Sequence, residues 1–445
     1  MEPNTLLDAL LDEAGMSRAG LAARVNSLTK SRGKATRYDH ASVIRWLRGQ
    51  RPRGAVPDMI CDIFTEQLGR PFSHDDIGMG EPLSVDVPRG GLAAFIDRST
   101  ALWRADEQQR SDVREASTID GLAAVAPVWE WENPPEDTDV SREGTSHVGA
   151  PDIDVLRTAR THYEQMYRKV GGVAARDRIV RFLTGDVAPV LRGSYSDAVG
   201  RELHRAVGGL VSIAGICAYD SDAQGLAQRY FHQALRLAKA SGDRSFGGYV
   251  IALMVNQSVF LREYRQAVAF AEAGLRTAGS HISPALATDL YAMQAKAFAR
   301  MGDQINAHRC MALAETAAGR IHPGDEPEET GYVQPGLVEA HLAEALISLG
   351  DMSPAQEYAH EAVRSQAHAR GRVHRLATLT NVQLRSGENE QAAATAAAMV
   401  REARGMESQR LRDRLISVRR SFAEHGGAAA RDTTELIDET LRLPL

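Results

Sequence analysis

A repeat of about 40 residues runs through the second half of the chain and restricts it to stacked helical units. Its clearest marker is an alanine at Ala227, Ala267, Ala307, Ala355 and Ala392, with intervals of 40, 40, 48 and 37 residues. Seven residues further on, two turns along the same helix face, stand Ala234, Gly274, Ala314, Ala362 and Met399. Most units therefore place a small side chain where two helices must approach closely, as in solenoids built from helix pairs.

Short polar turns separate the two predicted helices of each unit. The residue before the turn is Gly302, Gly350 or Gly387 in the last three units, each followed by an acidic residue. The longest interval contains the sequence IHPGDEPEETGYVQPG, which we interpret as a loop insertion. Residues 151–200 and 410–445 are predicted to be flanking helices that cover the open ends of the stack.

Composition supports an all-α fold. Aromatic residues make up only 6% of the chain, whereas strands favour aromatic and β-branched side chains. A chain of 445 residues is also too long for a single core. We predict a small domain at residues 1–80, a helical connector with an acidic Pro/Gly linker at 81–150, and the repeat domain at 151–445. An irregular Ala-rich helical bundle is the alternative for the third segment.

The charge of the chain is concentrated near its start. The net charge is −6, but between Arg18 and Arg53 ten basic side chains face a single acid, Asp39, which gives +9 and leaves −15 for the other residues. A basic block within an acidic chain is typical of a DNA-binding domain. A solvated basic loop is the alternative.

Start and stop signals divide this basic domain into helices. The candidate caps are Asn4, Ser17 and Asp39, the stops are Gly15 and Gly49, and a fourth helix spans residues 57–68. In the third helix, a rotation of 100° per residue places Val43, Trp46 and Leu47 on one side and Ala41, Ser42, Arg45 and Arg48 on the other. We interpret Trp46 as a core residue and the arginine-bearing face as one that fits a major groove.

These residues resemble a helix-turn-helix of the phage-repressor type, with S-x-x-x-L-A-x-x-V from Ser17 and S-V-I-R-W-L-R-G from Ser42. In that family the second helix places its N-terminal side chains among base edges. The chain departs from the family by a connection of about a dozen residues instead of a tight turn, which suggests a basic wing or arm on phosphates. The predicted base contacts are His40, Ser42, Arg45 and Arg48, with Arg45 suited to bidentate bonds with guanine. The other predicted DNA-binding residues are Ser17, Lys30, Arg32, Lys34, Arg37, Arg51 and Arg53, the basic ones as phosphate contacts.

The repeat resembles the tetratricopeptide repeat in a longer version, over about residues 200–410. It lacks the proline that ends a tetratricopeptide unit, so a HEAT-like or other paired-helix solenoid remains an alternative. If the solenoid binds a peptide, a small molecule or a protein, the first helix of each unit lines its concave face. The candidate groove residues are Tyr249, Asn256, Lys296, Arg300, Glu344, Asn381 and Arg385. The alternative is that these side chains face water in an empty groove.

No catalytic or metal-binding constellation is evident in the sequence. The run Gly33-Lys34-Ala35-Thr36 lacks the upstream glycine and strand of a phosphate loop, and His360-Glu361 lacks the second histidine of a zinc motif. Cys61, Cys217 and Cys310 are far apart and odd in number. We therefore expect no enzyme, no catalytic residue, no metal and no cofactor, and a cytoplasmic, nucleoid-associated protein without a membrane span.

The chain resembles the actinobacterial helix-turn-helix and tetratricopeptide regulators, which include repressors of sporulation and antibiotic production. The resemblance is carried by V-I-R-W-L-R-G-Q-R-P-R-G, L-R-G-S-Y and A-Q-R-Y-F-H-Q-A-L-R-L-A. Peptide-sensing quorum regulators of Gram-positive bacteria share only the architecture. The resemblance implies a homodimeric repressor of development or secondary metabolism that binds a pseudo-palindromic operator in double-stranded DNA and is a candidate effector sensor. The alternative is a tetratricopeptide-type interaction scaffold that binds nucleic acid without sequence preference.

Overall fold

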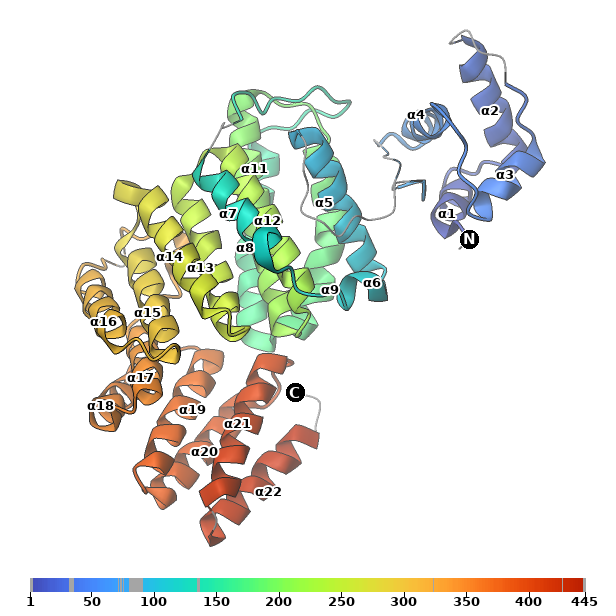
Figure 1. Cartoon of the computed structure of the whole chain (residues 1–445). Helices are drawn as coiled ribbons and strands as arrows, with labels where there is room; N and C mark the ends of the chain where they lie inside the picture. Colours follow the sequence, from blue (N-terminus) through green and yellow to red (C-terminus); the bar gives the residue numbers. More distant parts are fainter. Residues whose placement is uncertain are drawn as a thin grey trace. The chain divides into compact units, whose positions relative to one another are not determined.

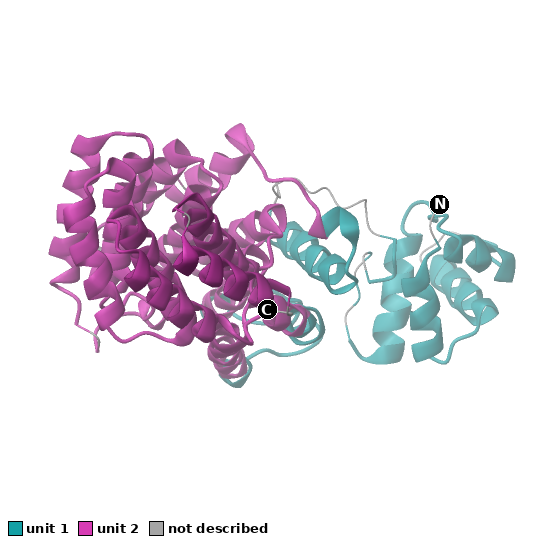
Figure 2. Ribbon diagram, turned by 90° about the horizontal axis from the view of Figure 1, so that it is seen from below, with its two compact units in different colours: residues 1–113, 139–152, 181–200 teal, residues 114–138, 153–180, 201–445 magenta. Residues whose placement is uncertain are grey.

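The computed structural model describes residues 3–31, 36–70, 72, 74, 76–79, 91–133, 137–322, 324–425 and 427–442. As predicted, these residues form an all-α fold (Figure 1), with no strand among them apart from two isolated backbone bridges. Two compact units are distinguished in Figure 2, one formed by residues 1–113, 139–152 and 181–200 and the other by 114–138, 153–180 and 201–445. The units cut across the predicted boundaries, because each takes part of the predicted connector.

Four helices form the N-terminal domain of the first unit. They are α1 (Thr5–Glu13), α2 (Arg18–Ser31), α3 (His40–Leu47) and α4 (Val56–Leu68). Each contributes apolar side chains to one core, among them Leu7, Val25, Trp46 and Phe64. Trp46 is 4% exposed, which confirms its assignment to the core. Asn4 caps α1 by accepting a hydrogen bond from the N–H of Leu7, and its amide donates to the carbonyl oxygen of Ile77, which ties residues 76–79 to this domain.

The rest of the first unit contains α5 (Leu92–Glu107), the π-helical turn Leu183–Val187 and α10 (Ala188–Leu191). Residues 139–149, which we predicted as linker, are hydrogen-bonded to the backbone of the L-R-G-S-Y segment. Arg142 exchanges two backbone hydrogen bonds with Tyr195, at 2.9 and 3.0 Å, and Ser194 pairs with Ser146 and Val148. The segment is a loop, as expected from its sequence, but it is docked rather than a spacer, because backbone pairing of this kind leaves no periodic side-chain pattern.

The second unit consists mainly of antiparallel helix pairs (Figure 1). The pairs are α11 (Asp197–Asp220) with α12 (Gln224–Ser241), α13 (Arg244–Phe260) with α14 (Tyr264–Ala278), α15 (Pro284–Arg300) with α16 (Gln304–Ala318), α17 (Leu337–Leu349) with α18 (Met352–Arg364), α19 (Ala369–Arg385) with α20 (Asn389–Ala403), and α21 (Gln409–His425) with α22 (Ala428–Arg442). Three further helices precede them, α7 (Gly121–Glu132), α8 (Ala150–Val170) and α9 (Gly172–Phe182), and the short α6 (Ser111–Arg114) lies where the two units meet in the sequence. This arrangement is a helical repeat, as predicted.

The alanine repeat occupies equivalent places in the helix pairs. Ala227, Ala267, Ala307, Ala355 and Ala392 are each the fourth residue of the second helix and are 0% exposed. A Cβ atom on Gly274 would lie 3.1 Å from Ile251 of α13 and 3.3 Å from Leu290 of α15, so α14 passes close to both helices. Small side chains are needed at this face because neighbouring helices approach from two sides.

The turn inside each pair also repeats. The residue five positions before the alanine has a positive φ in all five pairs that carry this alanine: Gly302 (77°), Gly350 (86°) and Gly387 (79°), but also Asp222 (63°) and Arg262 (67°). The next residue donates its backbone N–H to a carbonyl oxygen five residues earlier, as Glu263 does to Ser258 at 2.9 Å and Asp303 to Phe298 at 2.9 Å. This is the hydrogen bond of a Schellman cap, and it ends the first helix in the same way each time.

The last repeats are bonded to the first helices of the second unit. The Asp220 carboxylate at the end of α11 is 0% exposed; it accepts from Gly172 N–H at 2.7 Å and from the Ser408 hydroxyl at 2.8 Å, and it pairs with Arg370. Nearby, Glu407 N–H donates to the carbonyl oxygen of Val170 at 2.8 Å. The segment between α20 and α21 is therefore in contact with the ends of α8, α9 and α11, so this end of the repeat stack is not open. In the described part of the chain, no helix is long and apolar enough to cross a membrane.

Candidate nucleic-acid interface

The helix α3 begins at a capping box. Asp39 accepts from the backbone N–H of Ser42 at 2.8 Å, and the Ser42 hydroxyl lies 3.3 Å from the N–H of Asp39 in return. Hydrogen bonds from the Ser42 hydroxyl and backbone lower the pKa of the Asp39 carboxyl. The helix ends at Leu47, and Gly49, the predicted stop, follows the C-cap residue Arg48 with a φ of +90°. Both predicted ends of α3 are confirmed, so its side chains have a defined direction.

The outer side of α3 carries His40, Ala41, Arg45 and Arg48, all exposed. Ser42 is placed differently from our prediction. It is 3% exposed, and its hydroxyl donates to Asp39 at 2.7 Å and accepts from Arg45 Nη2 at 3.0 Å. A capping-box residue turns back toward the cap, so Ser42 is positioned to orient the Arg45 guanidinium rather than to reach a base.

The long connection between α2 and α3 is fixed at its described end by Asn26, which sequence reasoning missed. Its amide donates to the carbonyl oxygen of Tyr38 at 2.8 Å, and its oxygen accepts from the N–H of Tyr38 at 2.9 Å and the hydroxyl of Thr36 at 2.9 Å. Thr36 and Thr29 share a further hydrogen bond. The only signal in the sequence is a run of polar residues late in α2, which does not identify its partners.

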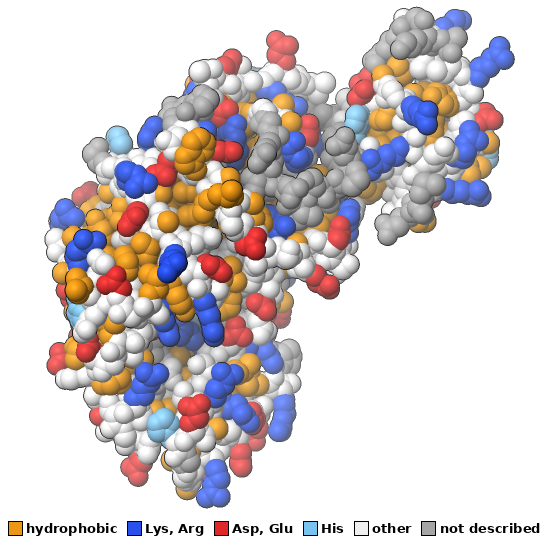
Figure 3. Space-filling model, in the orientation of Figure 1, with side chains coloured by type: hydrophobic (Ala, Val, Ile, Leu, Met, Phe, Trp, Pro, Cys, Tyr) orange, Lys and Arg blue, Asp and Glu red, His pale blue; other side chains and the backbone are white. Residues whose placement is uncertain are grey.

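The predicted phosphate contacts lie on the surface of the same domain. Lys30, Arg37, Arg51 and Arg53 are exposed, and among the described residues none of the four forms an ion pair. Figure 3 shows Lys and Arg side chains at several places on this domain. Ser17 is exposed and caps α2 by accepting from Gly20 N–H at 3.1 Å. Arg32 and Lys34 lie outside the described residues.

The predicted groove residues all lie on first helices of the repeat pairs, and most of them tie one first helix to the next. Asn256 accepts from the hydroxyl of Tyr219, Asn381 accepts from the hydroxyl of Ser421, and Arg385 donates to the carbonyl oxygen of Ile347. Arg300 is exposed. Tyr249 is 4% exposed and packs against Phe246 and Tyr332, so it is covered rather than open to a groove.

Lys296 and Glu344 are the two predicted groove residues that the structure brings into contact. Lys296 Nζ lies 2.7 Å from one carboxylate oxygen of Glu344, and Arg414 lies 2.8 Å from the other. Burial alone would raise the pKa of Glu344, but Arg414 and Lys296 outweigh it and hold that pKa well below its usual value. Burial beside Lys296 lowers the pKa of His341 to about 3, so this imidazole is neutral at pH 7.

One family model matches the chain, the SP15 N-terminal domain, over residues 7–80. The match therefore covers most of the four-helix N-terminal domain, together with residues 76–79, which Asn4 ties to it. No curated protein matches the chain. Within the described residues no three His, Cys, Asp or Glu side chains converge as they would around a metal ion.

Proposed function

We propose that the protein is a sequence-specific, DNA-binding transcriptional regulator whose N-terminal domain is a helix-turn-helix. The observation that carries the proposal is the outer side of α3, where Arg45 and Arg48 stand exposed on a short helix capped at both ends. A helix of this length spans about 12 Å, which suits the major groove of B-DNA. The Ser42 hydroxyl supports the same role, because it holds Arg45 in one direction before any DNA binds.

The surroundings of α3 are also suited to DNA. A helix-turn-helix reads bases with its second helix and positions that helix by phosphate contacts around it. Arg37 precedes α3, whereas Arg51 and Arg53 follow it, so exposed cations flank both of its ends. In this proposal Arg45 and Arg48 contact bases, whereas Lys30, Arg37, Arg51 and Arg53 contact phosphates.

The repeat domain, in this proposal, is of the tetratricopeptide kind and forms a homodimer. Two N-terminal domains then occupy half-sites about 34–36 Å apart, or a multiple of that, on a pseudo-palindromic operator. Effector binding to the repeats changes the operator affinity by favouring one arrangement of the dimer. The sequence phrases given above make the actinobacterial repressors of development and secondary metabolism the functional analogy for this proposal.

Selection of bound sequences from a pool of random DNA duplexes tests this function. The full-length protein is expected to enrich one motif with two related half-sites. Retention of DNA at low salt without any enriched motif would instead favour the interaction scaffold, because phosphate contacts alone do not distinguish sequences.

A further inference from the structure

The loop insertion between α16 and α17 reaches first helices of earlier repeats. Its central part, residues 325–333, contains a short 3-10 turn at Glu328–Thr330; we call this part the strap. Glu326 lies 3.3 Å from the first free N–H of α15, at Ala285. The Tyr332 hydroxyl donates to Asp289 of α15 at 2.6 Å, and Val333 is buried in the core of the middle repeats.

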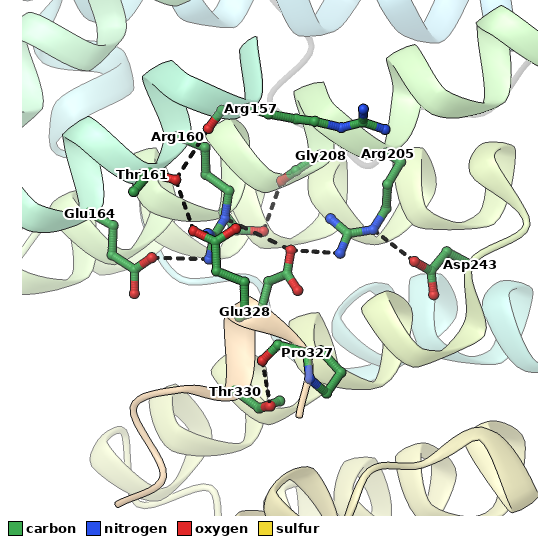
Figure 4. A network of polar contacts seen from close by, with 12 residues as sticks. Arg157, Arg160, Thr161, Glu164, Arg205, Gly208, Asp243, Pro327, Glu328 and Thr330 are labelled. Atoms are coloured by element: carbon green, nitrogen blue, oxygen red, sulfur yellow. Dashed lines mark hydrogen bonds and ion pairs between the residues drawn. The ribbon is translucent and has the colours of Figure 1, made fainter. Parts of the chain in front are cut away.

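Between these two attachments the strap presents a pair of acidic side chains to two arginines (Figure 4). Arg160 of α8 is 4% exposed, and its guanidinium lies 3.1 Å from Glu328. Arg205 of α11 lies 2.6 Å from Glu329 and 3.9 Å above the ring of Phe246. The two guanidinium groups lie on helices far from the strap in sequence, and each also has a carboxylate partner outside the strap. They therefore form a pair of sites for carboxylates whose position does not depend on the strap alone.

The strap is not required to connect the helices that it joins. The other intervals between the repeated alanines are 37 or 40 residues, whereas this one is 48, so this connection is longer than the repeat needs. The backbone N–H groups of Thr330, Gly331 and Val333 donate only to carbonyl oxygens within residues 327–330. The middle of the strap is therefore held on α8 and α11 by side chains rather than by backbone pairing.

The fit of Arg160 to the strap is also incomplete. In the described part of the chain, no nitrogen of its guanidinium makes a hydrogen bond of good geometry, although it is almost fully buried. Glu329 is a second neighbour at 3.9 Å, and the side chain of Glu328 is 62% exposed. A guanidinium often donates two parallel hydrogen bonds to one carboxylate, and Arg160 does not do so with either glutamate of the strap.

Charge at the site points to the same ligand. Without the strap, Arg160 and Arg205 keep one carboxylate each, Glu164 at 3.1 Å and Asp243 at 2.7 Å. Each guanidinium then has donors left for a second acidic group. An apolar or basic segment would leave the remaining donors of Arg160, which is 4% exposed, without an acceptor, which is unfavourable.

We propose that the strap is an internal ligand and that Arg160 and Arg205 form a binding site for an acidic peptide segment of another protein. Two acidic side chains of that segment take the places of Glu328 and Glu329, and the strap is displaced. The regulatory consequence, a change in operator affinity, rests on the proposed function, but peptide binding does not.

The test measures peptide binding to the full-length chain without DNA. The probe is a fluorescein-labelled peptide of residues 324–331, and fluorescence anisotropy gives its dissociation constant. The variant Glu328→Gln/Glu329→Gln weakens the strap and is expected to bind the probe about ten-fold more tightly than wild type, because the competing internal ligand is removed. Addition of Arg205→Gln to this variant is expected to abolish the gain.

Asp325→Asn is the matched control, since it removes a charge from an exposed strap residue that is not among the ion-pair partners of Arg160 and Arg205. A second variant, with residues 327–331 replaced by Gly-Ser-Gly-Ser-Gly, removes the acidic pair outright and retains Tyr332 and Val333. A probe in which Glu328 and Glu329 are replaced by glutamine should bind neither variant. The proposal is overturned if both variants fold and bind the acidic probe no better than Asp325→Asn. It is equally overturned if both fail to fold, because a strap that folding requires cannot be displaced by a partner.

Discussion

Asn26 holds the backbone of Tyr38, twelve residues later, by donating to its carbonyl oxygen at 2.8 Å and accepting from its N–H at 2.9 Å. The ring of Tyr38 in turn packs edge-on against Trp46, with centroids 5.2 Å apart. One amide in α2 thus determines where the chain enters α3. We expect the direction of Arg45 and Arg48 to depend on this attachment, although neither is among the hydrogen-bond partners of Asn26.

Asn26→Ala removes this attachment and leaves the Tyr38 backbone without its partners. We expect the free energy of unfolding of the N-terminal domain to fall by about 1–3 kcal/mol, because three hydrogen bonds of a half-buried amide are lost together. Operator affinity should fall while the preferred sequence stays the same. Urea unfolding and a DNA titration measure the two effects. Ser27→Ala, at an exposed neighbouring position, is the control and should change neither.

Arg45 and Arg53 are expected to differ in kind as DNA contacts. Arg45→Ala should weaken binding to the selected operator by about 1–3 kcal/mol and relax the base preference at one position of each half-site. Arg53→Ala should weaken binding to all sequences alike and reduce the salt dependence by about one phosphate contact per protomer. Titrations of operator and scrambled DNA at several salt concentrations separate the two. An equal loss on both DNAs for Arg45→Ala would contradict its role in base recognition.

Arg262 is a non-glycine residue in the left-handed conformation that glycine occupies at the same place in three other repeats. An L side chain is strained there by about 1–2 kcal/mol, part of which is offset by the greater freedom of glycine in the unfolded chain. Arg262→Gly should therefore raise the free energy of unfolding by about 0.5–1 kcal/mol. Gly302→Ala, the reverse change one repeat later, should lower it by about 1 kcal/mol. Thermal and urea unfolding test both, and a destabilised Arg262→Gly protein would show that the arginine side chain matters more than its backbone.

His232 should make the protein sensitive to mild acid. Burial, with a smaller contribution from Arg229, lowers the pKa of His232 to about 3. Because this pKa is depressed, the unfolded chain takes up the proton first, and stability is lost as the pH falls below about 6.5. The loss is at most about 1.4 kcal/mol per pH unit for one such group. His232→Gln should therefore lose less stability than wild type between pH 7.5 and 5.5, whereas His162→Gln, at an exposed position, should behave as wild type.

Asp289 should have the opposite pH dependence. Burial raises its pKa to about 6, although the Tyr332 hydroxyl and Lys296 act against burial. The folded chain holds this proton more tightly than the unfolded chain, so the free energy of unfolding falls as the pH rises from about 4 to about 6. Asp289→Asn stays neutral and can still accept from Tyr332. We expect it to stabilise the protein by about 1–3 kcal/mol at pH 7.5 and by much less at pH 4.5, measured by urea unfolding.

The periodic and local features of the fold were predictable from the sequence. The repeated alanines are buried at equivalent places, and Asn4 and Asp39 cap their helices as predicted, because caps and helix faces depend on residues three or four positions apart. Ser42 was misplaced because helix periodicity places it at the edge of the exposed face, whereas the capping box turns its hydroxyl inward.

Contacts between distant segments were not predictable. The pairing of Arg160 with Glu328 joins residues on α8 and in the loop insertion, and nothing in the spacing of either segment refers to the other. The predicted groove residues were found on the expected helices, but most of them serve as ties between those helices. Periodicity indicates which face a residue occupies and not which partner it meets there.

The contacts of Asp220 with Ser408 and Arg370 affect how the repeat domain folds and unfolds. An open array of repeats behaves as a one-dimensional chain, in which end units fray and each interface counts separately. Here the hydroxyl of Ser408 reaches a carboxylate 188 residues earlier, so the terminal repeats gain a neighbour that an open array does not have. Unfolding of the last repeats then removes contacts from α11 at the other end of the domain, so we expect the repeat domain to unfold in a single transition. Such long-range closure also slows folding, because the whole domain must be assembled before the contact forms.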